Sequence, residues 1–197
     1  MTSHTDTRQI ILDTAAQLFH HQSYTAVGVA SICKQADVSK GSFFHFFKSK
    51  QDLAIAVMQQ FEQQINSSLI AKSFTEKLSP LKRLEQFINE LYTFQKAQMK
   101  AEGHLPGCPF GNMAMEQSTQ DELIRQKASA CLNGLSQHFA SAIKDAIKAG
   151  ELPKLNVKAT ADAMVSYIEG IQLLAKTRND PELIRKLGPA ISSIKIM

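Results

Sequence analysis

The sequence predicts an all-α protein of about nine helices, and three features of the chain support this prediction. Apolar residues recur every three or four positions through most of the chain, as they do along one face of a helix. No stretch shows the two-residue alternation of a half-buried strand. Proline, glycine and small polar residues stand at the ends of the periodic segments, where such residues start or stop helices.

The first 48 residues carry short apolar stripes joined by tight turns. One stripe runs from Ile11 to Phe19 and a second from Val29 to Ala36. The residues Asp37-Val38-Ser39 are typical of a turn, and Ser39 is suited to cap a third helix that ends at Phe47. We therefore expect residues 1–48 to form one domain of short helices.

Residues 49–197 carry longer stripes, which suit a helical bundle. Ser49 and Asp52 resemble a capping box, Pro80 suits a first helical turn, and Gly150 suits a helix end. The helices expected in this second domain cover residues 49–65, 80–102, 110–117, 121–149, 157–177 and 181–194, the last interrupted at Gly188-Pro189.

Composition narrows the class of protein. Hydrophobic residues make up 44% of the 197 residues and charged residues 20%, which allows a real core and argues against global disorder. The net charge of +4 is only mildly basic, but residues 1–50 hold five basic and three acidic residues and four of the six histidines. Neither an apolar run of about 18 residues nor a signal peptide is evident, so no membrane partner is expected.

Three cysteines, Cys33, Cys108 and Cys131, are an odd number at wide spacing. They fit neither a disulfide framework nor a zinc pattern, and a reducing compartment suits them best. We therefore expect a cytoplasmic protein with no metal and no cofactor.

A helix, a three-residue turn and a second helix over residues 29–47 have the spacing of a helix-turn-helix. The second helix of such a motif lies in the major groove of DNA, with its N-terminal residues at the base edges. The spacing alone is weak evidence, because any helical bundle has short turns. Lys40 and Gly41 strengthen it, since they place a cation and a closely approaching backbone at the helix start. Lys48 and Lys50 precede or begin the next helix, where phosphate contacts are common.

The run YTAVGVASICKQADVSKGSFFHFFKSK, residues 24–50, closely resembles the DNA-binding region of the TetR family of bacterial repressors. The shared elements are the Val38-Ser39-Lys40-Gly41 start, the hydrophobic Phe43, the aromatic block 44–47 and the Ser49-Lys50 pair. The resemblance implies an all-α homodimer that binds a palindromic double-stranded operator and whose C-terminal bundle binds a small-molecule effector. The DNA-binding residues expected on this basis are Ser39, Lys40, Gly41, Ser42, Phe44, His45, Phe46, Lys48 and Lys50.

Three departures from the family pattern remove polar groups. Phe44 stands where the family usually has Tyr, Phe46 where it has His or Tyr, and Val27-Gly28 where it often has a Thr/Ser pair. Fewer hydroxyl contacts should leave more of the affinity to the lysines and to His45. The alternative is that Phe44 and Phe46 simply extend the core.

Cys108 lies between Gly107 and Pro109, just before the short helix expected over 110–117. A thiolate near a helix N-terminus is stabilised by the helix dipole, and such a cysteine reacts with electrophiles or oxidants. The alternative is a small buried hydrophobic residue, the usual fate of a free cysteine. The segment also resembles that of a TetR subgroup whose members respond to reactive small molecules. Cys33 and Cys131, on helical stripes, are interpreted as structural.

Large, adaptable side chains are numerous on the middle helices, and they suit an apolar effector pocket around the middle of the bundle. Ordinary core packing is the alternative for each of them. The expected pocket residues are Phe61, Phe87, Phe94, Phe110, Met113, Met164 and Tyr167.

The last two helices, about 159–194, carry apolar stripes that one antiparallel pair does not wholly bury. Pairing two copies would make a four-helix interface of two-fold type. The expected interface residues are Val165, Ile168, Ile171, Leu183, Leu187 and Ile191.

No catalytic constellation is evident, and Glu116, Asp121 and Glu122 are interpreted as helix-end charges. We therefore expect a TetR-type regulator, a repressor released by a small-molecule or electrophile signal, and not an enzyme. Two alternatives remain: an all-helical thiol enzyme that uses Cys108, and a helical adaptor that uses residues 159–194 as a partner face.

Overall fold

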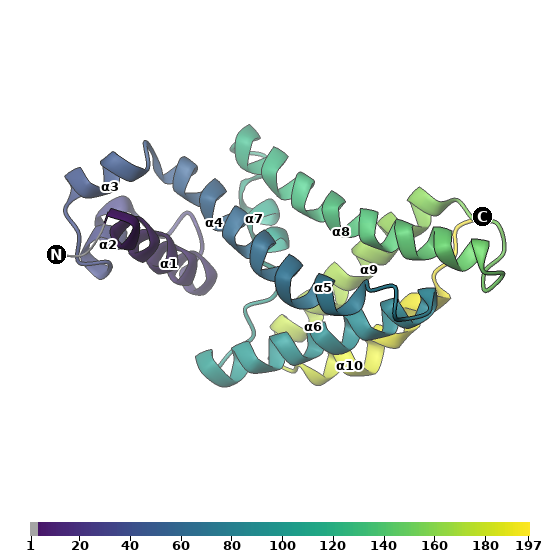
Figure 1. Ribbon diagram of the computed structural model, residues 1–197. Helices are drawn as coiled ribbons and strands as arrows, with labels where there is room; N and C mark the ends of the chain where they lie inside the picture. Colours follow the sequence, from purple (N-terminus) through teal and green to yellow (C-terminus); the bar gives the residue numbers. More distant parts are fainter. Residues whose placement is uncertain (1–3) are drawn as a thin grey trace. The chain divides into compact units, whose positions relative to one another are not determined.

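The computed structural model describes the backbone of residues 4–197 and the side chains from residue 6 onward. Every regular element in this part of the chain is helical and none is a strand, which confirms the predicted all-α class (Figure 1). The elements are α1 (His4–Gln22), α2 (Val29–Gln35), α3 (Lys40–Phe46), α4 (Lys50–Ile65), the π-helix η1 (Asn66–Ile70), α5 (Ala71–Ser73), α6 (Pro80–Glu102), α7 (Pro109–Gln117), α8 (Glu122–Lys148), α9 (Val157–Arg178), α10 (Glu182–Leu187) and the 3-10 helix η2 (Gly188–Ser193).

The chain forms two compact units, and both are discontinuous in sequence. The first extends to Glu62 and includes Pro109–Ser129, and the second comprises Gln63–Cys108 and Ala130–Met197. This division into compact units differs from the boundary expected after residue 48. That boundary was expected between a DNA-binding part and a sensing part, and it stays a prediction. Two of the breaks between the compact units fall inside helices, at 62/63 in α4 and at 129/130 in α8, where no turn or proline marks them.

The first unit buries the apolar stripes that the sequence predicts. The core side chains come from α1, α2, the α3 region and α4, and most are almost completely covered: Ile11, Ala15, Leu18, Phe19, Ile32, Cys33, Phe43, Phe47, Leu53 and Val57. The Phe43 and Phe47 rings are 6.1 Å apart, and the Arg8 guanidinium lies 5.2 Å from the Phe47 ring centroid. These contacts anchor α3 on the unit by one face.

The predicted helix caps are present. The Ser39 hydroxyl accepts a hydrogen bond from the Ser42 amide at 3.0 Å, and the Ser49 hydroxyl accepts one from the Asp52 amide at 3.0 Å. Each satisfies one amide that the first helical turn leaves unpaired. Gly28, where the family often has a hydroxyl residue, begins α2 without a side-chain cap.

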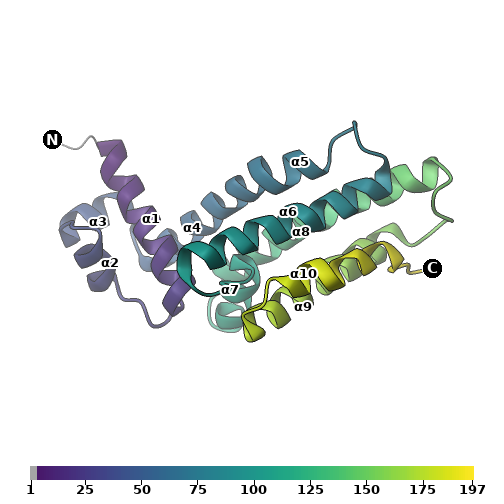
Figure 2. The ribbon, with the colours of Figure 1, turned by 90° about the horizontal axis from the view of Figure 1, so that it is seen from below.

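The second unit packs α6, the later part of α8, α9 and α10 with η2 around one core. Figures 1 and 2 both show α10 lying beside α6 and α9. Phe87, Phe139, Met164 and Ile168 are almost fully buried there. None of the helices in residues 4–197 combines the length and apolarity needed to cross a membrane.

Glycine and proline end the helices largely where the sequence predicts. Gly103 after α6 and Gly150 after α8 have φ values of 80° and 76°, a conformation that favours glycine. Pro80 stands in the first turn of α6, and Gly188-Pro189 changes α10 into the 3-10 helix η2. The sequence did not predict η1, which continues α4 beyond Ile65.

Candidate nucleic-acid interface

The turn between α2 and α3 is closed by backbone hydrogen bonds. The Val38 amide donates to the Cys33 carbonyl at 3.0 Å, and the Asp37 amide donates to the Lys34 carbonyl. Asp37 has φ of 52°, a left-handed conformation that Asp tolerates better than most residues. The helix-turn-helix spacing therefore corresponds to a real, tightly closed turn.

The two faces of α3 differ in exposure. Phe43 is 0% exposed and holds the helix to the core, whereas Lys40, Gly41, Phe44 and His45 lie on the solvent side. A side chain added at Gly41 would meet only the Ser39 hydroxyl, at 3.6 Å. The packing of the protein therefore does not require glycine there, and the exposed face is open to a close partner.

The aromatic block divides between core and surface. Phe44 is 52% exposed, so the interpretation that it extends the core is wrong for this residue. Phe46 is half-buried, and its ring stands edge-on to that of His45 at 4.8 Å. The Ser42 hydroxyl is 3.0 Å from the Ser39 hydroxyl, so these two groups share a hydrogen bond. A DNA-contacting role for all of these residues stays a prediction.

The lysines near α4 have different environments. Lys48 is exposed, but Lys50 is half-buried, and its ammonium donates to the carbonyl oxygens of Tyr24 and Val27 at 3.0 Å each. Burial lowers the pKa of Lys50, and the Glu116 charge opposes this shift.

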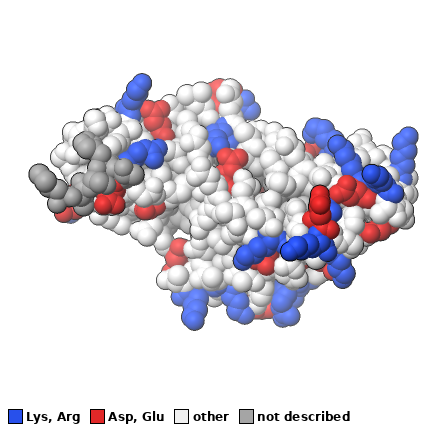
Figure 3. Space-filling model, in the orientation of Figure 1, with Lys and Arg blue, Asp and Glu red and all other residues white. Residues whose placement is uncertain are grey.

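Lys and Arg side chains are not confined to the first unit. On the face drawn in Figure 3 they are spread over the surfaces of both units.

Glu116 was interpreted from the sequence as a helix-end charge, but its carboxylate binds a distant loop. Its carboxylate accepts hydrogen bonds from the amides of Tyr24 at 3.0 Å and Thr25 at 2.5 Å. Tyr24 and Glu116 are 92 positions apart, so no local spacing links them. The helix-end interpretation is confirmed for Asp121, whose carboxylate accepts from the Ile124 amide at 3.0 Å.

The three cysteines differ in exposure. Cys33 and Cys131 are each 5% exposed, whereas Cys108 is only half-buried and directly precedes α7. The Cys108 thiol shares a hydrogen bond with the carboxyl group of Glu169 on α9. Burial raises the pKa of Glu169, and this hydrogen bond opposes the shift.

A chain of buried amides continues from this pair. Gln95 Nε2 donates to the Gly107 carbonyl at 3.2 Å and to Gln172 Oε1 at 3.0 Å. Gln172 Nε2 in turn approaches Glu169 Oε1 at 3.4 Å. Gln95 Oε1 is buried without a hydrogen-bond partner. The segment before Cys108 is thus joined to α6 and α9 by polar groups.

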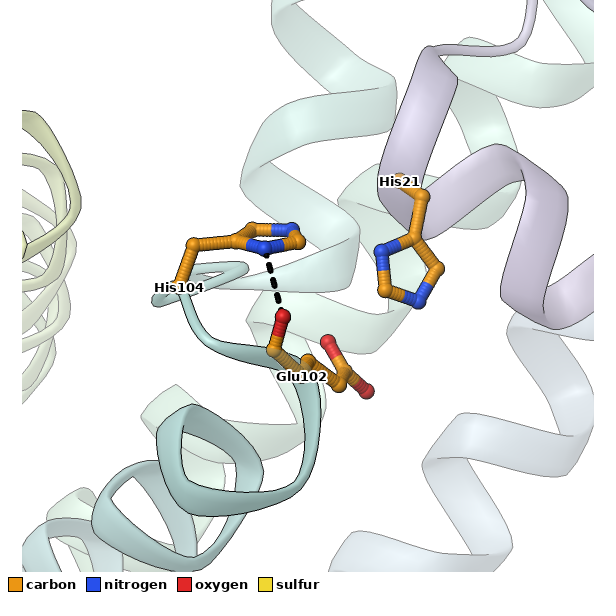
Figure 4. A group of neighbouring side chains, drawn as sticks. All are labelled: His21, Glu102 and His104. Carbon is orange, nitrogen blue, oxygen red and sulfur yellow. Dashed lines mark hydrogen bonds between the residues drawn. The ribbon is translucent and has the colours of Figure 1, made fainter.

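The beginning of that segment is also fixed. The Leu105 amide donates to Asn179 Oδ1 at 2.8 Å, next to the C-terminal end of α9. His104 Nδ1 and the Glu102 carbonyl share a hydrogen bond at 3.0 Å, marked in Figure 4, where His21 of the other unit is also drawn. The path from α6 to Cys108 is therefore held at several points.

The expected pocket residues are divided between the two units. Phe61, Phe110 and Met113 belong to the first unit. Within the second, Phe87 and Met164 are nearly fully buried in the hydrophobic core, and Phe94 and Tyr167 pack against that core. Ordinary core packing therefore describes the placement of these four side chains, and an effector-binding role for the set remains a prediction.

The expected dimer face needs correction. Val165, Ile168, Ile171 and Ile191 lie in the core of the second unit, so they offer little surface to another copy. Of the expected residues, Leu187 is exposed and Leu183 is half-buried. Leu173 and Leu174 on α9 are exposed neighbours that were not predicted. Apolar periodicity identifies the apolar residues of a helix but does not show which of them pack within the protomer.

Comparison with known proteins agrees with this arrangement. Residues 11–57 match the model of bacterial regulatory proteins of the tetR family, and residues 80–191 match that of the tetracyclin repressor-like C-terminal domain. An uncharacterised HTH-type transcriptional regulator of Bacillus subtilis, YxaF, is 30% identical over 200 residues, which cover 95% of this chain and 100% of that protein.

Two solved structures have the same fold. A TetR regulatory protein from Rhodobacter sphaeroides is 25% identical with a TM-score of 0.82, over 95% of this chain and 98% of the other. The reduced form of Escherichia coli NemR is 21% identical with a TM-score of 0.81, over 96% and 98% of the two chains. The chain therefore belongs to the TetR family of helix-turn-helix transcriptional regulators.

Proposed function

We propose that this regulator is a homodimeric repressor that binds a palindromic operator in the bacterial cytoplasm and releases it when Cys108 is modified by an electrophile or oxidant. The observation that carries the DNA-binding part is the exposed face of α3. Lys40, Gly41, Phe44 and His45 share that face, while Phe43 anchors the other. A helix held by one face and bearing a cation, a small residue and an imidazole on the other suits the major groove.

Phosphate contacts should come from the ends of the motif. Lys48 is exposed immediately before α4, and the Ser39-capped start of α3 presents backbone amides. Lysines and helix N-termini commonly contact phosphate and set the register of a protein on the duplex. Base preference should depend more on Lys40 and His45, which lie within α3.

Two observations support homodimerisation: membership of the TetR family and the exposed leucines of the second unit. Leu173, Leu174 and Leu187 retain 50%, 41% and 38% exposure. Two copies related by a two-fold axis would present two α3 helices to half-sites about one helical turn apart. A palindromic operator is the DNA counterpart of that symmetry.

Cys108 is the proposed sensor because its thiol is the least buried of the three and has an acidic partner. When an α,β-unsaturated carbonyl reacts, the sulfur bonds to the β-carbon and the S–H proton passes to the Glu169 carboxylate. The carbon–carbon π pair moves towards the carbonyl, and the resulting enolate takes up a proton at the α-carbon. The structurally similar repressor NemR was solved in a form described as reduced.

The test is alkylation of the full-length protein with limiting N-ethylmaleimide, followed by mass spectrometry and a DNA-binding assay. We expect Cys108 to be labelled well before Cys33 and Cys131, since these two are buried. Labelling should release wild-type protein from DNA and leave Cys108→Ser bound. If Cys108→Ser is released equally, or if Cys108 is protected, the effector is a non-covalent ligand.

The same reaction separates this proposal from a thiol enzyme. A regulator should consume about one equivalent of electrophile per reactive thiol and then stop. Repeated turnover of the electrophile by wild type, lost in Cys108→Ser and accompanied by no DNA binding, would favour the enzyme instead.

A further inference from the structure

The loop of residues 23–28 joins α1 to α2 and sets the position from which the helix-turn-helix begins. Ser23 has φ of 93°, an unfavourable conformation for a residue other than glycine. The Val27 amide donates to the Tyr24 carbonyl at 3.3 Å, which closes the turn. Such a backbone persists only when surrounding groups hold it.

Glu116, in the last turn of α7, holds the amide side of this loop. One carboxylate oxygen accepts from the Tyr24 amide at 3.0 Å and the other from the Thr25 amide at 2.5 Å. Gln117, the next residue, donates from Nε2 to the Thr25 hydroxyl at 3.0 Å. Burial raises the pKa of Glu116, but the hydrogen bonds from Thr25, Tyr24 and Ser23 lower it by more. The net pKa is therefore below the ordinary value, and the carboxylate stays ionised.

Lys50, in the first turn of α4, holds the carbonyl side of the same loop. Its Nζ lies 3.0 Å from the Tyr24 carbonyl oxygen, 3.0 Å from that of Val27 and 4.1 Å from the Tyr24 ring centroid. Two of the three N–H donors of a lysine are thereby used inside the protein. Tyr24 is bound at its amide by an anion and at its carbonyl by a cation.

We propose that Glu116 and Lys50 form a loop clamp that positions the helix-turn-helix for DNA, so that both are positioning residues of the recognition site. Glu116 and Lys50 hold Tyr24 from α7 and α4, two elements outside the motif. Hydrogen bonds to charged groups are among the stronger ones, and losing one partner leaves the other unpaired. This assignment replaces the phosphate contact expected for Lys50 from the sequence.

The dependence of DNA affinity on salt separates the two roles. Each phosphate contact makes the slope of log K against log salt concentration more negative by about 0.9, whereas a positioning residue leaves the slope unchanged. Affinities are measured for a duplex that the wild-type protein selects from a random-sequence library, and for an unrelated duplex of equal length. Exposed Lys48→Ala is the matched cation control.

We expect Lys50→Met and Glu116→Gln to weaken binding of the selected duplex about ten-fold, with an unchanged salt slope. Binding of the unrelated duplex should change little, because phosphate neutralisation is intact. Lys48→Ala should reduce the slope by about one for both duplexes. Lys50→Arg, which still donates to both carbonyls, should restore affinity for the selected duplex.

Two further measurements make the test independent of folding defects. In wild-type protein, hydrogen exchange at the Tyr24 and Thr25 amides should be strongly protected. In the double variant Lys50→Met/Glu116→Gln, the loss of affinity should be smaller than the product of the single losses, since both residues act on Tyr24. A slope reduced by about one in Lys50→Met, wild-type affinity in Glu116→Gln, or fast exchange at both amides would overturn the clamp.

Discussion

At the scale of single residues, Gly41 is not required by the packing of the protein, but we expect it to be required for DNA binding. A methyl group there meets only the Ser39 hydroxyl at 3.6 Å, so Gly41→Ala should be tolerated and should stabilise α3 by about 0.5 kcal/mol. The same methyl group would stand on the face proposed to approach DNA. We expect affinity for the selected duplex to fall at least about ten-fold, as measured by fluorescence anisotropy alongside urea unfolding.

The matched control is Gly134→Ala, at a helical glycine of α8 with nothing within 4 Å of the added carbon. It should stabilise the protein by a similar amount and leave DNA affinity unchanged. Equal DNA affinity for Gly41→Ala and wild type would show that the backbone of α3 does not approach DNA closely.

A second prediction at this scale concerns His138 and pH. Burial lowers the pKa of His138 below its ordinary value of 6.5, and its ring packs 5.4 Å from that of Phe74. The unfolded chain therefore binds more protons near pH 6 than the folded chain does. This contribution to stability is complete above about pH 7 and is lost as the pH falls through the unfolded and then the folded pKa.

The measurement is the free energy of unfolding in urea from pH 5 to pH 8 for wild type and for His138→Gln. The difference between the two curves should change across this range, with wild type losing more stability than the variant on acidification. A constant difference would mean that His138 has the same pKa in the folded and unfolded chains.

At the scale of elements, the packing of α10 and η2 against α6 requires glycine at position 188, where there is no room for a side chain. A carbon added at Gly188 would lie 2.3 Å from Ile88 Cγ2, and Ile88 is almost fully buried. Gly188→Ala should therefore cost about 1–3 kcal/mol of stability through overpacking. Urea unfolding measures this cost, with Gly134→Ala on α8, where an added carbon has open space, as the neutral or stabilising control.

The partner residue supplies the internal check. In an Ile88→Ala background the clash disappears, so adding Gly188→Ala should cost much less than in wild type. Strictly additive effects would mean that α6 and η2 separate to accommodate the methyl group.

Helix ends and local caps could be predicted from the sequence because their causes are local. Ser39, Ser49, Pro80 and Gly150 act within one turn of their own positions, and all four have the predicted role. Glu116 could not be found in this way, since its partners are on a distant loop. Lys50 matched a family motif, but its ammonium is directed to backbone carbonyls that the motif does not specify.

At the scale of the whole molecule, apolar periodicity identified the helices but not which of their faces remain uncovered. Ile168 has the periodicity of an interface residue, yet it is 1% exposed within its own unit. The boundaries between the two units inside α4 and α8 could not be predicted either. A continuous helix has no turn, glycine or proline at the point where its packing partners change. The fold class and the helix-turn-helix were predictable, whereas burial and long-range contacts required the structure.

Dimerisation can now be tested at a residue with free surface. Leu173→Asp, at a side chain that is 50% exposed, should leave the protomer folded and produce a monomer in sedimentation velocity. Leu123→Asp, at a side chain that is 51% exposed on the first turn of α8 in the other unit, is the matched control and should remain dimeric. A dimeric Leu173→Asp protein would remove this part of α9 from the proposed interface.

DNA recognition by α3 of a dimer is tested most directly by selection of DNA from a random-sequence library by the full-length protein, with sequencing of the bound pool. We expect enrichment of one palindrome whose half-sites are about one helical turn apart. We also expect Lys40→Ala to select a pool with relaxed base preference and Leu173→Asp to enrich no palindrome. An unenriched pool, or an enriched sequence that Lys40→Ala selects unchanged, would contradict the claim that α3 of a dimer reads DNA.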